Sequence, residues 1–374
     1  MSQSHTDKLH DTIPATMNAF VLKGHGDFDQ LQWHEDWPVP VAGGDEVIIK
    51  VGACGLNNTD INTRTAWYSK AVSTNTTGGA FDEADDDDAT WGGAPISFPR
   101  IQGADVVGTV VALGPEADAS LLGKRVMIDT WLRDWDDPTN LDKTGYYGSE
   151  CDGGFAHYTK VTQKQVHPIL SDLSDAQLAT FATSYITAEN MLERGQVKAG
   201  DSVLITGASG GVGSALIQLV KRRGATAIAL SSLSKADDLT AIGADVVIDR
   251  NEADFKKALI AATGKATVSV LADVVGGSEW HKWLDCIERG GRLTCAGAIA
   301  GPMVAFDLRT FYLRDLTFTG ATIVPVGLFA KLVSYIEAGE IKPLIAAQFD
   351  LRDLHDAQRL FIKKSHIGNI VVCP

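Results

Sequence analysis

A glycine-rich turn between a predicted strand and a predicted helix constrains this fold more than any other feature. Residues 203–206 are apolar or β-branched, residues 207–214 read GASGGVGS, and an amphipathic stretch follows to residue 223. Gly210 and Gly211 let the backbone approach a diphosphate, and the helix start offers unpaired N–H groups to phosphate oxygens. The alternative is a glycine turn without a ligand. The motif predicts a dinucleotide site whose turn residues are Ser209, Gly210, Gly211 and Val212.

The pattern around this motif predicts two domains, as expected for a chain of 374 residues. Short β-rich runs at 17–22, 46–54, 105–113 and 124–129 are typical of a small, mostly antiparallel barrel. A helical pair at 171–195 leads into alternating strands and helices, which indicate a doubly wound parallel sheet. Strands are expected at 202–206, 227–230, 246–248, 268–273, 291–295 and 316–319, and helices at 213–223, 234–242, 253–263 and 280–287. We place the first domain at 1–175, completed by 326–374 (helix 326–338 and strand 369–373), and the second at 176–325.

The end of the second strand of the parallel sheet bears on the choice of dinucleotide. NAD sites usually place a carboxylate there to hold the ribose hydroxyls. This chain has Ser231, Ser232 and Lys235 instead, and no carboxylate before Asp237. Hydroxyls and a lysine suit a 2′-phosphate, so we expect NADPH rather than NADH. Alternatively, Ser232 only caps the next helix and Lys235 is solvated.

Composition excludes several classes of partner. The formal net charge of −14 disfavours nucleic acid and anionic membrane surfaces. No apolar run reaches the roughly 20 residues of a membrane span, and the first residues lack the features of a secretion signal. The five cysteines are scattered and are expected to be free thiols. We expect a cytoplasmic enzyme with a small-molecule substrate, forming a homodimer or homotetramer.

Several further motifs, in order, resemble the medium-chain dehydrogenase/reductase superfamily over nearly the whole chain. They are residues 103–108 with 111–114, 152–158, 198–213, 290–292 and 366–371. The resemblance implies an α/β protein in which a GroES-like, mostly-β catalytic domain packs on a Rossmann domain, with the site between them. One departure is Asn369, where members usually carry lysine, which puts a phosphate contact from the C-terminal tail in doubt.

Zinc alcohol dehydrogenases of that superfamily hold their metal through a cysteine, the histidine of a Gly-His-Glu triplet and a third ligand. Here the first position resembles Asn57, and the triplet reads Gly103-Ala104-Asp105. No cysteine occurs between Cys151 and Cys286 for the third position, and residues 70–98 lack the structural zinc cysteines. Because zinc needs at least three protein ligands, we expect no metal.

The resemblance is instead to the quinone oxidoreductase and enoyl reductase branch, which implies hydride transfer to an α,β-unsaturated carbonyl or a quinone. Such chemistry spreads charge over an enolate, which hydrogen-bond donors can stabilise without a Lewis acid. The alternatives are a metal-free alcohol dehydrogenase or carbonyl reductase, and a non-catalytic NADPH-binding protein.

Candidate catalytic residues are Asn57, Asp60 and Tyr68. The Asn57 amide is expected to donate to a substrate oxygen or the cofactor ribose, or else to satisfy a turn. Asp60 either serves the active site or only caps a helix over 60–64. Tyr68 donates a proton, stacks on the substrate or packs in a loop. Candidate cofactor contacts are Thr187, Val275, Gly297 and Ala298, the last three at ends of parallel strands, and the long segments 70–98 and 131–150 are candidate lids.

Overall fold

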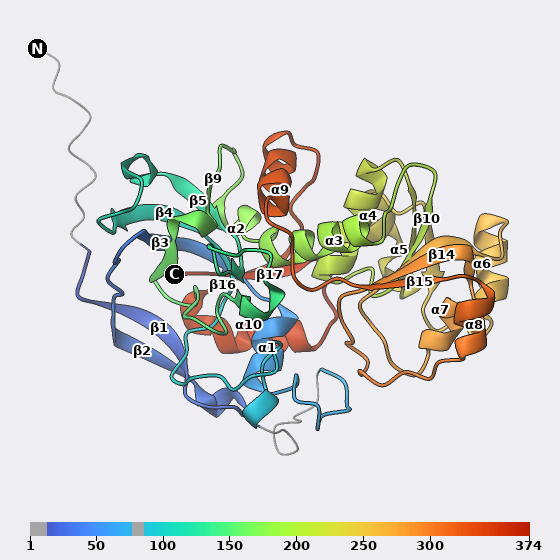
Figure 1. The fold of residues 1–374 in the computed structure, drawn as a ribbon, viewed down its shortest axis with the longest axis horizontal. Coiled ribbons are helices and arrows are strands. Elements are labelled where there is room, and N and C mark those ends of the chain that lie inside the picture. The colour runs from blue at the N-terminus through green and yellow to red at the C-terminus, as the bar shows by residue number, and fades with distance from the viewer. Residues whose placement is uncertain (1–12, 77–85) are drawn as a thin grey trace, which may run out of the picture.

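The computed structural model describes residues 13–76 and 86–374, and it is built around two large sheets (Figure 1). The first sheet has seven strands: six follow the order β16-β17-β3-β4-β5-β9, and the seventh, β8, pairs with β3; most of its pairs are antiparallel. It therefore confirms the expected mostly-β domain. A two-stranded ribbon, β1-β2, and a short hairpin, β6-β7, accompany it. The bounds are β1 (Thr16–Leu22), β2 (Leu31–Pro38), β3 (Glu46–Gly55), β4 (Asp105–Leu113), β5 (Arg125–Ile128), β6 (Trp131–Leu132), β7 (Gly145–Tyr146), β8 (Tyr158–Thr162), β9 (Val166–Pro168), β16 (Ile345–Asp350) and β17 (Asn369–Cys373).

The second sheet is parallel throughout, with the order β12-β11-β10-β13-β14-β15. Its strands are rich in buried Val, Ile, Leu and Ala because helices cover both faces. The chain reverses direction across the sheet between β10 and β13, and ligands of such sheets bind at the carboxyl ends beside this point. The bounds are β10 (Ser202–Ile205), β11 (Thr226–Ser231), β12 (Val246–Asp249), β13 (Val268–Asp273), β14 (Ile287–Cys295) and β15 (Thr317–Gly320).

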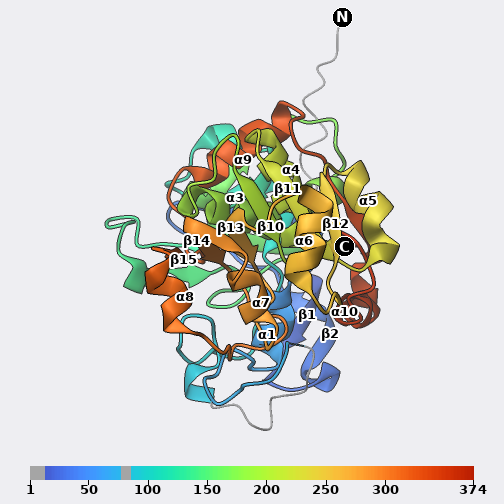
Figure 2. The ribbon, with the colours of Figure 1, turned by 90° about the vertical axis from the view of Figure 1, so that its right-hand side faces the viewer.

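Helices form the layers around the parallel sheet. Figure 2 shows α3 and α4 on one side of the strands and α6 and α7 on the other. Local signals set several helix ends: Ser174 and Gln177 form a reciprocal capping box on α2, and Gly264 ends α6 in the left-handed conformation. The bounds are α1 (Asn58–Arg64), α2 (Asp175–Leu178), α3 (Ala182–Arg194), α4 (Gly211–Arg222), α5 (Ala236–Ala241), α6 (Phe255–Thr263), α7 (Trp280–Leu284), α8 (Leu308–Leu313), α9 (Leu328–Glu337) and α10 (Leu354–Ile362).

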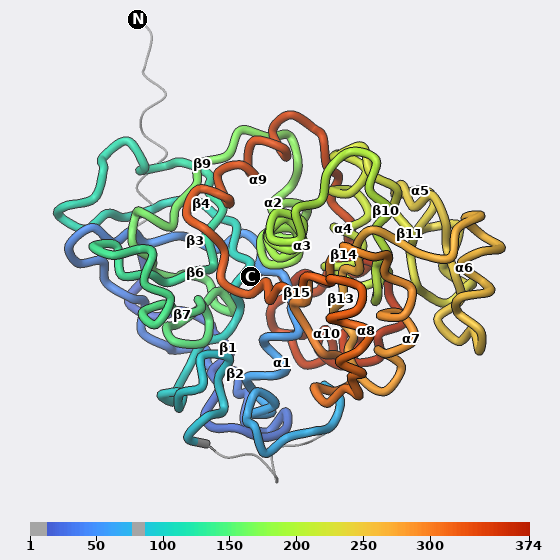
Figure 3. Tube along the Cα trace, turned by 45° about the vertical axis from the view of Figure 1, so that its right-hand side comes forward, coloured from blue at the N-terminus to red at the C-terminus, as the bar shows by residue number. Residues whose placement is uncertain are grey.

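The C-terminal tail returns to the first sheet, as the sequence predicted. Strand β17 pairs with β3, and β16 pairs with β17, so the last strands extend the sheet that the N-terminal half begins (Figure 3). On its way the tail passes the glycine turn, where Gly210 and Gly368 form a bridge and the Gly368 N–H donates to the Ser209 carbonyl at 3.0 Å. The tail thus joins the two sheets at the predicted nucleotide site.

Some boundaries differ from the predicted ones. Helix α1 begins at Asn58 with Asn57 as its N-cap, rather than at Asp60, because the Asp60 carboxylate accepts the Asn57 N–H from inside the first turn. Helix α7 ends at Leu284, before a strand that already begins at Ile287. Strands β2, β6, β7, β8, β9 and β16 and helices α8 and α10 were not predicted at all. The domain boundary at 175/176 stays a prediction. Within residues 13–76 and 86–374, no helix is both long and apolar enough to span a bilayer.

Candidate functional site

Three neighbouring cavities follow the carboxyl ends of the parallel strands. The first, of about 310 Å³, lies beyond β11 and β13; the second, of about 180 Å³, lies over the glycine turn; the third, of about 410 Å³, opens beside α3. The first two share Gly207. The last two share Thr59, Tyr68 and Thr187, among others. We call them the ribose cavity, the turn cavity and the aromatic pocket, and together they form one candidate site.

The glycine turn has the shape that its sequence predicted. Gly207 has a left-handed φ of +58°, which favours glycine. A Cβ on Gly213 would lie 2.2 Å from the Gly207 carbonyl oxygen, so only glycine lets α4 approach the strand this closely. Gly210, Gly211 and Val212 line the turn cavity, while Ser209 lines the ribose cavity. The N-terminus of α4 therefore faces a cavity, where its unpaired N–H groups could bind a diphosphate.

The ribose cavity contains two groups suited to a phosphate. The buried Ser231 lines it, as does Arg250, which follows β12 and was missed in the sequence. The Arg250 backbone N–H donates to the Ser231 carbonyl at 2.9 Å, so the two residues lie side by side. Ser232 does not line this cavity; its hydroxyl lies 3.0 Å from that of Ser234. Val275, at the end of β13, forms part of the opposite wall.

Lys235 does not extend into solvent. Its ammonium donates to Ser209 Oγ at 3.1 Å and to the carbonyl of His366 at 2.8 Å, which ties the tail to the glycine turn. Burial and the charge of Arg250 lower the pKa of Lys235. Lys364 lies nearby, with its ammonium 2.6 Å from Asn58 Oδ1, and burial lowers its pKa to about 7.

The basic residues beside the glycine turn indicate what kind of ligand this part of the site could bind. Burial, together with the charges of Lys364 and Lys235, lowers the pKa of His366 to about 4. In a chain with a net charge of −14, basic groups gathered beside a helix N-terminus are typical of an anion site.

Two buried amides beside the turn have an unused donor. Nδ2 of Asn57 and Nδ2 of Asn369 have no hydrogen-bond partner, although both side chains are buried. The Asn57 amide opposes the rise in the pKa of the neighbouring Asp105, but its nitrogen reaches no acceptor at hydrogen-bonding distance. Asn369 Oδ1 accepts from Ser184 at 2.7 Å and packs against Gly211. Buried donors without partners are rare, so these two amides fit a polar ligand such as a dinucleotide.

A pair of buried carboxyl groups lies behind the turn cavity. Asp60 accepts the Asn57 N–H at 2.8 Å, and Asp105 accepts the Thr183 N–H at 2.9 Å. Burial raises the pKa of Asp60 to about 7 and that of Asp105 to about 6. In the described part of the chain, neither carboxyl has a salt bridge. Asp60 does not line any of the three cavities, so the structure places it as a helix-start group.

The third cavity has a wall of aromatic rings contributed by three segments. Trp67 and Tyr68 follow α1, Trp91 comes from the first long segment, and Trp131 and Tyr146 come from the second. Trp91 and Trp131 meet edge to face with ring centres 5.2 Å apart, and Trp131 and Tyr146 meet at 5.4 Å. Both predicted lid segments therefore contribute to the site. Residues 77–85 of the first segment lie outside the described residues.

Thr187, Gly297 and Ala298 line both the turn cavity and the aromatic pocket. They lie where a nicotinamide ring would have to meet a substrate. Thr183, which was not predicted from the sequence, lies one helical turn before Thr187 and also lines both cavities.

The positions of the catalytic zinc ligands do not fit a metal. Asn57 offers an amide, and Ala104 offers only a methyl group that is 2% exposed. The Cys54 thiol is fully buried against Gly103 and Gly154, and it does not line the site. Among the residues that the structure describes, no cluster of three His, Cys, Asp or Glu side chains could hold a metal ion.

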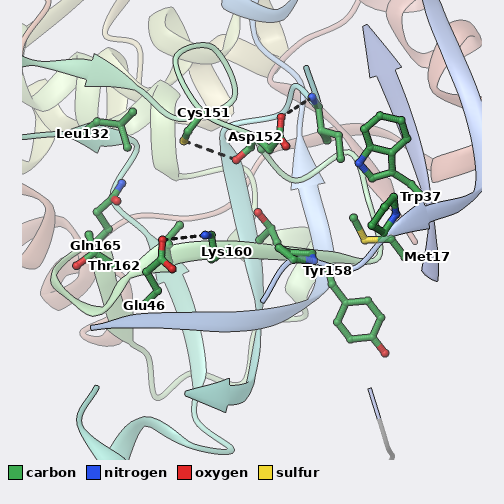
Figure 4. Close-up of a pocket in the computed structure, with 16 residues that line it drawn as sticks. Met17, Trp37, Glu46, Leu132, Cys151, Asp152, Tyr158, Lys160, Thr162 and Gln165 are labelled. Carbon is green, nitrogen blue, oxygen red and sulfur yellow. Dashed lines mark hydrogen bonds and ion pairs between the residues drawn. The ribbon is translucent and has the colours of Figure 1, made fainter. Parts of the chain in front are cut away.

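A separate cavity of about 400 Å³ lies by the first sheet and shares no residue with the candidate site. Figure 4 shows Glu46 paired with Lys160 in this cavity, and Asp152, another lining residue, forms an ion pair with Arg100, which does not line the cavity. Ion pairs that satisfy each other leave no charge for a ligand. We assign it no function.

Comparison with known proteins identifies the family. The model of the alcohol dehydrogenase GroES-like domain matches residues 43–171, and that of the zinc-binding dehydrogenase matches residues 211–338. A solved structure of a putative alcohol dehydrogenase from Sinorhizobium meliloti 1021 is 41% identical, covers 98% of this chain and 99% of that chain, and has a TM-score of 0.89. The chain belongs to the medium-chain dehydrogenase/reductase superfamily.

Curated relatives include members of the predicted branch of this superfamily. Human quinone oxidoreductase is 25% identical over 93% of this chain and 95% of its own length. The chloroplastic NADPH-dependent alkenal/one oxidoreductase of Arabidopsis thaliana is 27% identical over 97% of this chain and 81% of its own length. The predicted GroES-like and Rossmann combination is confirmed as well, and the chain is an oxidoreductase of a superfamily that acts on small molecules. The name of the second family model mentions zinc, but its match begins at residue 211 and does not include Asn57 or Ala104.

Proposed function

We propose that this enzyme is an NADPH-dependent, zinc-independent reductase of activated double bonds, with an α,β-unsaturated carbonyl compound or a quinone as substrate. The observation that carries the proposal is that the turn cavity and the aromatic pocket are adjacent and share lining residues, among them Tyr68, Thr187 and Gly297. A flat, apolar acceptor in that pocket would lie against a nicotinamide held at the strand ends. The names of the quinone oxidoreductase and alkenal/one oxidoreductase relatives support the same class of acceptor.

Bound NADPH would supply the hydride, and the residues of this chain would hold both partners in place. Asn57 lines the turn cavity but not the aromatic pocket, so we assign its free Nδ2 donor to the cofactor rather than to the substrate. The aromatic wall would exclude water and hold the acceptor flat. Phenols and threonine hydroxyls in the pocket would stabilise the negative charge that develops on the acceptor oxygen, which is why no Lewis acid is needed.

The preference for NADPH rests on the ribose cavity. Ser231 and Arg250 would hold the 2′-phosphate, with Lys235 acting at the edge of the glycine turn. An arginine can bind a phosphate with two hydrogen bonds, and the end of β11 carries no carboxylate to repel one, although Glu279 lines another part of the same cavity. We place Ser232 in a supporting role, because its hydroxyl pairs with Ser234.

The test is NADPH oxidation with three acceptors: an enone, a benzoquinone and a saturated ketone. The enone or the quinone should be turned over and the ketone should not. Turnover of the ketone alone would refute the proposal and favour a metal-free carbonyl reductase, the class that fits the name of the Sinorhizobium relative. Cofactor binding without turnover of any acceptor would favour a nucleotide-binding protein instead.

Two glycine-to-alanine variants, one inside the site and one outside it, test whether the activity depends on this site. Gly210→Ala is tolerated by the fold, because the added Cβ meets only the Gly207 oxygen at 3.5 Å, yet it narrows the turn cavity. It should abolish NADPH binding, whereas Gly92→Ala, whose nearest contact is at 3.8 Å outside the site, should not.

We also propose that the enzyme is a homodimer or homotetramer. Leu308, Tyr312 and Leu313 of α8 are exposed, as is Met303, and β15 beside them is the edge strand of the parallel sheet. Clustered apolar side chains beside a sheet edge are typical of an interface. Light scattering after size exclusion should give at least twice the 39.9 kDa of one chain, and a monomer at micromolar concentration would contradict this.

A further inference from the structure

A chain of hydrogen bonds leads from the aromatic pocket to a buried carboxyl group. The Tyr146 hydroxyl oxygen lies 2.6 Å from Thr183 Oγ1, and that hydroxyl contacts the Asp105 carboxyl group. The Thr183 backbone N–H also donates to Asp105, at 2.9 Å, and fixes the carboxyl group against the start of α3. The three residues come from β7, α3 and the start of β4, so only the fold brings them together.

The two ends of this chain have different surroundings. Tyr146 and Thr183 line the aromatic pocket, whereas Asp105 is 1% exposed and lines none of the cavities of the site. Burial disfavours the charged form of Asp105, and the charge of Asp105 in turn raises the pKa of the neighbouring Asp60. A carboxyl group that is buried beside another carboxyl keeps a proton more readily than an exposed one.

We propose that Tyr146 is the proton donor of the reaction and that Thr183 and Asp105 form the relay that restores its proton. The inference rests on the proposed function, because hydride addition to an enone leaves an enolate that must gain one proton. The Tyr146 O–H bond breaks as a C–H bond forms at the α-carbon of the substrate. The Thr183 hydroxyl proton then passes to the Tyr146 oxygen, and the Asp105 carboxyl proton passes to Thr183. Water in the emptied pocket returns one proton to the chain, so each turnover consumes one hydride and one solvent proton.

Tyr68 lines the same pocket but lacks this connection. The partners of its phenol are the side chains of Asn62 and Thr59, an amide and a hydroxyl. Neither group is an acid near neutral pH, so neither can replace a lost proton. We therefore assign Tyr68 to substrate positioning; Tyr68→Phe removes a hydroxyl from the same pocket, so it should lower kcat/KM, and it is compared with Tyr146→Phe only in the stereochemistry of the product.

The experiment reduces 2-methylcyclohex-2-enone with NADPH, because protonation at its α-carbon creates a stereocentre. The wild-type enzyme should give one enantiomer of 2-methylcyclohexanone in excess. Tyr146→Phe should lower kcat about 100-fold, the usual size of general acid catalysis, and the residual product should be racemic. Tyr68→Phe should still give one enantiomer in excess. Circular dichroism and NADPH titration verify that both variants fold and bind cofactor.

Thr183 tests the relay separately. Thr183→Val keeps the backbone contact to Asp105 but removes the hydroxyl, so kcat should fall about tenfold while Tyr146 still delivers its proton to one face. Thr183→Ser should restore the rate; failure to restore it would overturn the relay.

The remaining outcomes separate the two proposals. A retained excess in Tyr146→Phe, or a racemic product from the wild-type enzyme, would overturn Tyr146 as the donor while leaving the proposed function intact. Absence of wild-type turnover with every enone and quinone would refute the proposed function, and the relay with it.

Discussion

Asp60→Asn is expected to change how the stability of the protein depends on pH. Burial raises the pKa of Asp60 from 3.8 to about 7. The folded state therefore binds the proton of Asp60 more tightly than the unfolded state does. The resulting stabilisation is complete below about pH 4 and is lost as the pH rises to about 7. Asparagine keeps an oxygen that can accept the Asn57 N–H and removes the titration, so the variant should gain stability relative to wild type as pH rises.

The size of this effect follows from the pKa. A rise in pKa of about 3 units changes the free energy of unfolding by about 4 kcal/mol over the complete titration of Asp60. About two thirds of this change falls between pH 5 and pH 8. Urea unfolding at those two pH values measures the difference in unfolding free energy between variant and wild type. Relative to wild type, Asp60→Asn should be about 2–3 kcal/mol more stable at pH 8 than it is at pH 5.

A matched substitution controls for the general effect of removing a charge. Asp172 is exposed, and Asp172→Asn makes the same chemical change at the surface, so its difference from wild type should be nearly equal at both pH values. If the difference for Asp60→Asn also stays constant within about 0.5 kcal/mol, the carboxyl is ionised in the folded state at both pH values and our account of its burial is wrong.

Other changes test the cofactor site and the pocket. Arg250→Ala should raise the KM for NADPH about tenfold and leave the KM for NADH within about twofold, since only NADPH carries the 2′-phosphate; equal increases would contradict the assignment. Ser232→Asp should weaken NADPH binding by bringing a carboxylate near that phosphate, and an unchanged Kd would count against it. Trp91→Ala should raise the KM for an apolar enone about tenfold, whereas Trp135→Ala, outside the pocket, should not. Elemental analysis should find far less than one zinc per chain, and stoichiometric zinc would refute the metal-free site.

The elements of the parallel sheet were predictable because their signals are local. The strand Val268–Asp273 was predicted residue for residue, since a short, mostly apolar run ends at an aspartate shortly before two glycines. Helix α10 could have been found as well: Leu354, Ala357 and Phe361 are buried on one face at helical spacing. The edge strand β16 alternates between partly buried and exposed residues, and its signal is too weak to separate from a loop.

Site residues that depend on contacts distant in sequence were not predictable. Arg250 follows a strand that carries no motif, and it joins the site only because β12 pairs with β11 beside Ser231. Tyr146 lies in a segment that the sequence marked only as long and aromatic. Its contact with Thr183 spans 37 residues, and that of Thr183 with Asp105 spans 78, so no local spacing reveals the relay.

Asn369 shows how the fold compensates for a departure from the family pattern. A lysine at this position would put its charge next to the glycine turn, but here the charge comes from Lys364 and Lys235, which come close to the turn from the tail and from the end of β11. The smaller Asn369 can then hold Ser184 through its oxygen and turn its free Nδ2 donor to the ligand. Because burial lowers the pKa of Lys364 to about 7, a bound diphosphate would restore its full charge. Cofactor binding should therefore take up a proton near neutral pH, and it should weaken as the pH rises through about 7 in wild type but not in Lys364→Met.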